Sequence, residues 1–198
     1  MLKRSLDIII LFIFSPIIIS IYLLVSLIIY IFDGRPIIFK QKRCGHFCKE
    51  FNIYKFRTMK IKSKKKNNSD LKRITKLGKI LRLTSLDEIP SFYNVLIGNM
   101  TLVGPRPLLP EYLRFYSKYQ NRRHEVKPGI TGYAQVNGRN KLKWNDKFKL
   151  DVYYVKNSNI FLDIKILFLT FFKLFRIKDN QYNNKITMYK FSKKRIGN

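Results

Sequence analysis

An uncharged apolar segment near the N-terminus constrains the fold of this 198-residue chain more than any other feature. No charged residue occurs from Ile8 to Phe32, and these 25 positions are enough to cross a bilayer as a helix. The apolar stretch is too long for a signal peptide, and the sequence from Asp33 to Pro36 lacks the small residues of a cleavage site. We therefore expect residues 1–32 to stay in the protein and to hold it on a membrane.

The flanks and the middle of this segment bear on its topology. Basic residues stand on both sides, with Lys3 and Arg4 before it and Arg35 after it. A crossing helix would send one basic flank to the outer face, against the tendency of positive residues to stay inside. Ser15 and Pro16 interrupt the middle, where proline removes a helical hydrogen bond. The residues alone leave open a kinked transmembrane helix or a helix that returns to the same face.

The charge of the chain predicts an anionic partner. Forty Lys and Arg residues stand against 12 Asp and Glu, a formal net charge of +28. Candidates are nucleic acid, an anionic membrane surface or phosphorylated substrates. No recognisable nucleic-acid motif occurs, so we expect membrane lipids and phosphates, and no nucleic acid. Contact with anionic lipid is assigned to Lys3, Arg4, Arg35, Lys40, Lys42, Arg43 and the lysine-rich loop over Ile61–Asn68.

The remainder of the chain predicts an α+β, mostly helical fold, with a body over residues 33–177 and a basic polar tail over residues 178–198, which we expect to be loosely held. Short strands at Ile37–Phe39 and Phe51–Met59 form a small β-hairpin. Apolar residues and composition predict helices over Leu71–Leu83, Pro110–Val126 and Asn159–Ile177. The last is amphipathic and too interrupted by charge to span a membrane, so it lies either in the membrane interface or in the core.

Two adjacent acids, Asp87 and Glu88, are the first candidates for chemistry. One interpretation is a capping box, with Ser85 as N-cap and Glu88 three residues later. The other is a carboxylate at a helix N-terminus, surrounded by cations, that acts as nucleophile or metal ligand. Both interpretations are compatible. Adjacent helical residues point about 100° apart, so the two acids would have different roles.

A stiffly held arginine is the second candidate. Arg106 stands between Pro105 and Pro107, which restrict the backbone on both sides. Such an arginine suits a phosphate clamp, although a proline-braced surface turn explains the same residues. The glycine-bearing stretch Lys127–Asn140 is a ligand loop or a set of turns. Membrane attachment, an acid pair and placed cations together suit transfer of a phosphate-bearing group to or from a lipid.

Five ordered motifs carry a resemblance to a known family. They are Tyr54–Met59, Ser85–Pro90, Asn94–Met100, Val103–Pro107 and Pro128–Asn140. From about Leu2 to Phe175 the chain resembles the bacterial sugar transferases, the small monotopic phosphoglycosyl transferases. The stretch Leu150–Asn157 is also similar to the members that transfer diacetylbacillosamine phosphate in protein N-glycosylation.

The resemblance implies an enzyme that moves sugar-1-phosphate from a UDP-sugar onto undecaprenyl phosphate and releases UMP. This would be the first membrane step in the assembly of a glycoconjugate such as an N-glycan, O-antigen or capsule. Asp87 would be the nucleophile that forms a covalent phospho-sugar aspartate, Glu88 would assist, and Mg²⁺ near Asp87 would neutralise the diphosphate. The residues implied to contact phosphate or nucleotide are Arg82, Arg106, Arg139, Lys55 and Arg57.

The resemblance also implies a topology and a location. The family's Ser-Pro break, matched by Ser15 and Pro16, implies a re-entrant membrane helix at the cytoplasmic face of the bacterial inner membrane. Two departures from the family pattern are Cys48 in place of a common glycine and Ser91 in place of a common glutamine. A membrane scaffold in which the acid pair is only a helix cap is the alternative, and the sugar and the oligomeric state stay open.

Overall fold

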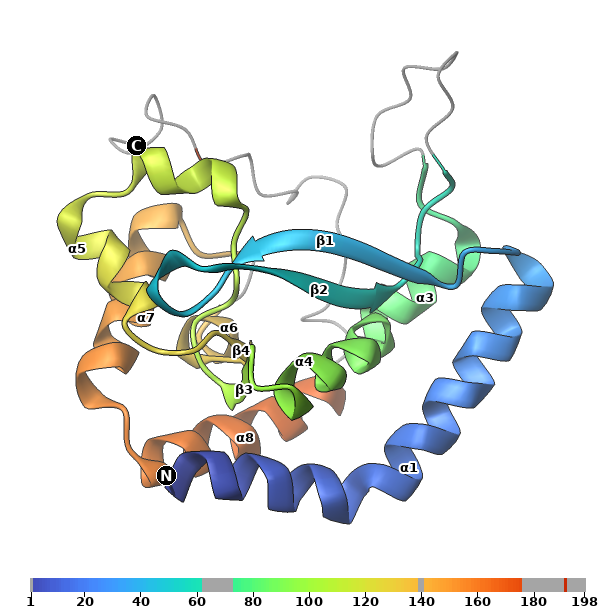
Figure 1. The fold of residues 1–198 in the computed structure, drawn as a ribbon, viewed down its shortest axis with the longest axis horizontal. Helices are drawn as coiled ribbons and strands as arrows, with labels where there is room; N and C mark the ends of the chain where they lie inside the picture. The colour runs from blue at the N-terminus through green and yellow to red at the C-terminus, as the bar shows by residue number, and fades with distance from the viewer. Residues whose placement is uncertain (1, 62–72, 139–140, 176–190, 192–198) are drawn as a thin grey trace.

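The computed structural model describes the chain except for residues 1, 62–72, 139–140, 176–190 and 192–198. It is mostly helical, as the sequence predicts, and the described residues form two small two-stranded sheets, of which the sequence predicts only the hairpin. A long N-terminal helix runs along the outside of a body of short helices and strands (Figure 1). The predicted loop over Ile61–Asn68 lies almost entirely outside the described residues.

Helix α1, Leu2–Phe32, is long and apolar enough to cross a membrane by length and composition. It contains Pro16 and bends sharply near its middle (Figure 1). Proline at position 16 leaves the carbonyl of Phe12, four residues earlier, without its helical donor. The Ser15 hydroxyl donates to that carbonyl over 2.7 Å. The serine thus satisfies the group that the proline leaves unpaired, and the predicted break lies inside one bent helix.

Polar contacts fasten the N-terminal end of α1 to the body. The Lys3 ammonium donates to the carboxylate of Asp163 over 2.7 Å and to the hydroxyl of Tyr154 over 2.6 Å. One turn later Asp7 is buried, and its carboxylate accepts from the Thr101 hydroxyl over 2.5 Å. Lys3 therefore contacts protein groups, in addition to the lipid contact predicted for it.

Apolar contacts fasten the other end of α1 to the same body. Val25 and Ile29 are buried and form one cluster with Phe56 and Leu81. The two halves of the helix thus meet a common globular unit on either side of the bend.

The predicted hairpin is present but its first strand is longer than expected. Strand β1, Ile38–Cys44, pairs antiparallel with β2, Glu50–Phe56, and Phe39 lies opposite Lys55. The residues after Phe39 are mostly polar because they face solvent or a cavity rather than the core, so the sequence lacks the apolar alternation that indicates a strand there. A second, parallel pair joins β3, Thr101–Val103, to β4, Gly129–Thr131. Strands this short leave no periodic signal in the sequence.

Two predicted helices are wrong in their extent. Helix α3, Lys76–Thr84, starts later than expected because the Thr75 hydroxyl caps it and accepts from the Gly78 amide. The helix predicted over Pro110–Val126 is broken, because Ser117 forms a capping box with Gln120 and restarts the chain there. Its three pieces are η3, Pro110–Phe115, α5, Lys118–Asn121, and η4, Arg122–His124.

Helices α7, Trp144–Asn157, and α8, Ile160–Phe175, close the fold. Helix α7 was not predicted, whereas α8 agrees with the predicted apolar helix over its described residues. Ile166 of α8 is buried in the main core, so this helix contributes to the core. The remaining short elements are η1, His46–Cys48, η2, Leu86–Ser91, α4, Phe92–Leu96, and α6, Tyr133–Val136.

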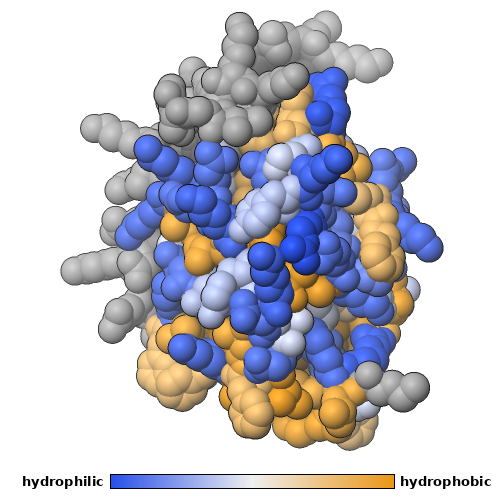
Figure 2. All heavy atoms as spheres, turned by 90° about the vertical axis from the view of Figure 1, so that its left-hand side faces the viewer, coloured by the Kyte–Doolittle hydropathy of each residue, from blue (hydrophilic) through white to orange (hydrophobic). Residues whose placement is uncertain are grey.

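Helices α1, α4 and α8 also expose large apolar side chains. Hydrophobic atoms gather along the lower edge in Figure 2, where Figure 1 places α8 and the first half of α1. We call this the apolar face; it includes Phe12, Ile13, Leu96, Ile97, Phe161, Ile164, Phe168, Phe171 and Phe172. Helix α8 therefore has one side in the core and one on the apolar face.

One residue of the basic tail is fixed in the core. Phe191 is buried in an aromatic cluster with Tyr112, Trp144 and Phe148, and the expectation of a loosely held tail is wrong at this position. Replacing Phe191 with alanine is expected to lower the free energy of unfolding by about 3–5 kcal/mol, since it leaves a cavity. Denaturant unfolding measures this. A loss below about 0.5 kcal/mol would contradict burial of the ring.

Candidate active site

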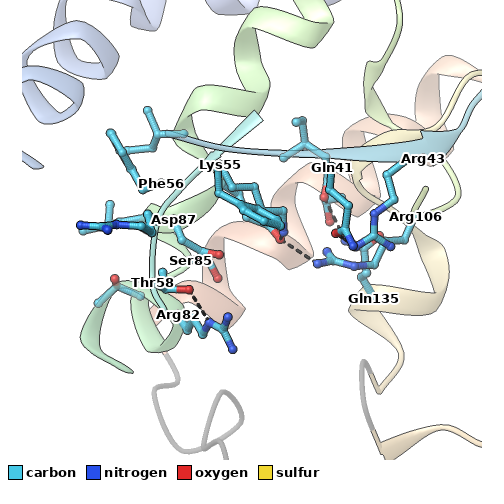
Figure 3. Close-up of a pocket in the computed structure, with 18 of the residues that line it drawn as sticks. Gln41, Arg43, Lys55, Phe56, Thr58, Arg82, Ser85, Asp87, Arg106 and Gln135 are labelled. Atoms are coloured by element: carbon cyan, nitrogen blue, oxygen red, sulfur yellow. Dashed lines mark hydrogen bonds and ion pairs between the residues drawn. The ribbon is translucent and has the colours of Figure 1, made fainter. Parts of the chain in front are cut away.

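A cavity of about 1210 Å³ opens between the hairpin, the end of α3, η2, the Gly104–Pro107 loop and α7. It is large enough for a substrate of nucleotide size. The structure brings the predicted site residues to its wall, except Arg139, which lies outside the described residues. The predicted residues that line it are Lys55, Arg57, Arg82, Asp87, Glu88 and Arg106. Figure 3 shows Asp87 and Arg82 to one side of Lys55, and Gln41, Arg43 and Arg106 to the other.

The predicted capping box at the acid pair is absent. Ser85 adopts a left-handed conformation, with φ of 60°, and its side chain makes no capping hydrogen bond. The residue ends α3 and starts the short helix η2, so the chain turns sharply just before the two acids. The Glu88 side chain does not return to Ser85 but points to cations from other elements. The capping interpretation therefore fails.

Glu88 is tied to two cations. One of its carboxylate oxygens accepts from the Lys55 ammonium over 2.6 Å and from the Arg106 guanidinium over 2.8 Å. Its side chain is 20% exposed, that of Lys55 is 18% exposed and that of Arg106 is 43% exposed. Burial opposes ionisation, but Arg106 and Lys55 outweigh it and hold the pKa of Glu88 well below its usual range. Glu88 is thus an ionised anchor between strand β2 and the arginine loop.

Asp87 has different surroundings. It is buried and lines the cavity, yet its carboxylate makes no hydrogen bond or ion pair within the part of the chain that the structure describes. Burial, and next the charge of Glu88, raise the pKa of Asp87, while Lys55, Arg106 and Arg82 act against that rise. A carboxylate without a partner inside a cationic cavity can attack an electrophile or bind a metal ion. The two adjacent acids therefore differ in what they can do.

A buried ion pair holds the arginine loop in place. Arg123 of η4 donates to the Asp151 carboxylate of α7 over 2.9 Å, and their side chains are 2% and 3% exposed. The same guanidinium donates to the backbone carbonyl of Arg106 over 2.6 Å. This hydrogen bond holds the backbone of the Pro105–Pro107 loop in place at Arg106. Sequence reasoning missed the ion pair, because nothing local pairs residues 123 and 151.

The two remaining predicted cations that the structure describes differ in position. Arg82 lines the cavity, and its Nε donates to the hydroxyl of Thr58 over 2.8 Å, which orients the side chain there (Figure 3). Arg57 also touches the cavity, but its guanidinium donates to backbone carbonyls just after α1. These are the carbonyls of Asp33, Gly34 and Arg35. Arg57 therefore fastens the end of α1, and its expected contact with phosphate stays a prediction.

Three polar residues of β1 line the cavity and were not predicted to do so, namely Lys40, Gln41 and Arg43. Gln41 and Arg43 follow Phe39 by two and four positions, so the three side chains lie on one face of β1. Lys55 is the partner of Phe39 across the hairpin and lies on the same face. Arg43 donates to the Gln41 side chain over 2.6 Å, and burial, followed by the charge of Arg106, lowers its pKa to about 10. Arg43 had been assigned to lipid contact. If the predicted strand had been extended past Phe39, the two-residue spacing would have placed Gln41 and Arg43 on the same face as Lys55.

Comparison with known proteins adds an independent finding. The model of the bacterial sugar transferase family matches residues 1–177. An uncharacterised sugar transferase of Bacillus subtilis, EpsL, is 51% identical over 161 residues, which cover 80% of each chain. The UDP-glucose:undecaprenyl-phosphate glucose-1-phosphate transferase of Escherichia coli is 41% identical over 192 residues, which cover 88% of this chain and 40% of that protein.

A further relative carries a different sugar in its name. The UDP-N-acetylgalactosamine-undecaprenyl-phosphate N-acetylgalactosaminephosphotransferase of Aeromonas hydrophila is 35% identical over 180 residues, covering 85% of this chain and 42% of that protein. The chain thus spans less than half the length of the last two relatives and most of the length of the first.

Proposed function

This chain belongs to the bacterial sugar transferase family, and on that premise we propose that it transfers a sugar-1-phosphate from a UDP-sugar to undecaprenyl phosphate and releases UMP. The names of the relatives from Escherichia coli and Aeromonas hydrophila support this donor and acceptor. The single observation that carries the proposal is the Asp87 carboxylate, which lacks a partner among the described residues in a cavity lined by cations.

The proposed reaction has two displacements at one phosphorus atom. In the first, a carboxylate oxygen of Asp87 bonds to the sugar-linked phosphorus of the UDP-sugar, and the bridging P–O bond breaks with its electron pair leaving on UMP. In the second, an oxygen of undecaprenyl phosphate bonds to the same phosphorus and the Asp87 carboxylate departs. Such transfers depend on position and neutralised charge, which Lys55, Arg82 and Arg106 supply. Glu88 positions two of these cations.

The residues present fit the magnesium ion that the resemblance implies. Magnesium is commonly bound by one or two carboxylates together with substrate phosphates. The described residues contain no cluster of three acidic, histidine or cysteine side chains, so Asp87 would hold the ion jointly with the diphosphate. When bound, the ion would neutralise negative charge on that diphosphate. Chelation is expected to abolish UMP release and added Mg²⁺ to restore it; full turnover in excess chelator would contradict this role.

We also propose that α1 enters the membrane and returns to the same side. Its bend at Ser15–Pro16 and the attachment of both of its ends to one body support this topology. The apolar face formed with α4 and α8 would lie in the lipid, with the cavity near the headgroups at the cytoplasmic face of the inner membrane. A helix that crossed would separate the contacts of Lys3 from those of Ile29 by a bilayer.

A labelling experiment tests the topology. Leu2 is exposed, so Leu2→Cys in a protein whose Cys44 and Cys48 are replaced by serine gives a single reporter. In intact spheroplasts, a membrane-impermeant thiol reagent is expected to leave this cysteine unlabelled until the membrane is opened. Labelling before that step would contradict the re-entrant helix.

The activity itself is tested by UMP release. The purified protein, undecaprenyl phosphate and Mg²⁺ are incubated with a panel of UDP-sugars, and each release rate is measured with and without the lipid. Lipid-dependent release from one or a few sugars is expected, and the preferred sugar identifies the substrate. No release from any sugar of the panel would contradict the proposal.

A further inference from the structure

Helix α7 contributes two charged side chains to the cavity wall that the proposed reaction does not use. Lys147 and Asp151 both line the cavity and stand four residues apart, so they share one face of the helix. Asp151 is engaged by Arg123 through two hydrogen bonds of 3.0 and 2.9 Å to one of its oxygens. The negative charge of Asp151 is therefore shared between Arg123 and Lys147, and it offsets the positive charge of Lys147 only in part.

Arg106 lines the same cavity, and its charge acts on Lys147. Its Nη2 donates to Glu88, and its other guanidinium nitrogens make no hydrogen bond to side chains or carbonyls of the described residues. Arg123 holds its backbone carbonyl and Asp151 holds Arg123, so the loop and α7 form one connected unit. This unit fixes Arg106 relative to the helix that bears Lys147. Two cations fixed near one cavity attract an anion between them.

The environment of Lys147 shows that these cations repel one another. Burial, and then the charge of Arg106, lower the pKa of Lys147 to about 8, while Asp151 acts against this and Arg123 adds to it. The Lys147 ammonium also lies 5.0 Å from the centre of the Trp144 ring, which restricts where it can point. A phosphate placed between Lys147 and Arg106 would relieve the repulsion and stabilise the charged amine.

We propose that Lys147 and Arg106 form a phosphate-binding subsite, in which the Lys147 ammonium contacts an anionic oxygen of a substrate phosphate. The inference rests on the proposed function and assigns a role to a residue outside the family motifs quoted above. The ligand chemistry is a phosphate group, either the uridine-linked phosphate that leaves as UMP or the phosphate of the lipid acceptor.

Proton uptake on binding tests the subsite with UMP as the probe. At pH 8.5 Lys147 is partly deprotonated, whereas the UMP phosphate, with a second pKa near 6, is fully ionised. UMP that contacts Lys147 must therefore draw a proton onto the protein. Calorimetry in buffers of different ionisation enthalpy measures this uptake. The Asp87→Asn protein is used throughout, so that the neighbouring carboxyl cannot take the proton.

The variants separate this effect from others. In that background Lys147→Arg, which stays charged, is expected to abolish the uptake and keep the affinity, and Lys147→Met is expected to weaken UMP binding about tenfold or more. Lys149→Met is the matched control, because Lys149 is on the same helix but exposed and outside the cavity lining. It is expected to change neither quantity.

Steady-state kinetics in the protein with Asp87 identify the source of the phosphate. A higher KM for the UDP-sugar in Lys147→Met assigns the subsite to the nucleotide, and a higher KM for undecaprenyl phosphate assigns it to the lipid. The inference is overturned if uptake, UMP affinity and both KM values match those of the Lys149→Met control. Such a result would leave the proposed function intact, since the parent protein would still release UMP; absence of UMP release from the parent would overturn the proposed function instead.

Discussion

Asp87→Asn is expected to lower UMP release by at least about a thousandfold while the protein stays folded. The amide keeps the size of the side chain but cannot act as the attacking oxygen. No hydrogen bond or ion pair of the described residues depends on the carboxylate, so the surrounding side chains lose no partner. Release of UMP and thermal unfolding, measured on the same preparation, check the two parts of this expectation.

The sign of the stability change follows from the raised pKa of Asp87. Burial raises this pKa above that of the unfolded chain, so the ionised carboxylate is disfavoured by folding. Below the unfolded pKa, near 3.8, Asp87 is neutral in both the folded and the unfolded chain, and its burial carries no charge penalty. As pH rises through the folded pKa, the buried carboxyl ionises and the free energy of unfolding falls. At pH 7 the neutral amide of Asp87→Asn avoids the free-energy cost of burying an ionised carboxylate. We expect the Tm of Asp87→Asn to equal or exceed that of the parent; a lower Tm with normal turnover would indicate a structural residue.

Glu88→Gln, the same chemical change one residue later, is expected to have the opposite effect on stability. It leaves Lys55 and Arg106 without the carboxylate oxygen that both contact. Breaking a buried ion pair costs about 3–5 kcal/mol, and the partial exposure of Arg106 places this loss at the lower end, about 3 kcal/mol. Turnover is expected to fall about a hundredfold, since both cations lose their positions. Denaturant unfolding and UMP release measure these quantities.

The pH dependence of stability provides the control for Glu88. The arginine and lysine partners hold its folded pKa below the unfolded value of about 4.3–4.5, so its stabilisation is complete above that value and is lost as pH falls below it. Glu88→Gln should therefore differ most from the parent at pH 7, and the difference in free energy of unfolding should become smaller as pH falls toward 3. An equal difference in free energy of unfolding at both pH values would contradict the ion-pair account.

Local patterns predicted the parts of the fold that depend on local chemistry. The uncharged run predicted α1, the Ser15–Pro16 pair predicted its bend, and the apolar spacing after Asn159 predicted α8. Element boundaries failed where a single polar side chain decides them. The Thr75 hydroxyl starts α3 late, and Ser117 with Gln120 breaks what looked like one helix, since capping outweighs apolar spacing over a few residues.

The candidate site was predictable in its members but not in their roles. Ser85 and Glu88 have the spacing of a capping box, yet the left-handed turn at Ser85 sends Glu88 to Lys55 instead. Arg57 follows Lys55 by two positions, but its guanidinium donates to backbone carbonyls of the residues just after α1. Contacts between segments 20 to 40 residues apart decide these outcomes, and no local pattern encodes them.

The central claim is that Asp87 forms a covalent bond to the transferred group. Incubating the protein with its UDP-sugar and Mg²⁺, but without undecaprenyl phosphate, isolates the first displacement. We expect a burst of UMP that approaches one equivalent per protein, and a peptide containing Asp87 whose mass is raised by one sugar phosphate. Undecaprenyl phosphate added afterwards should remove that mass. UMP release only when both substrates are present, with no modified peptide, would contradict the covalent account.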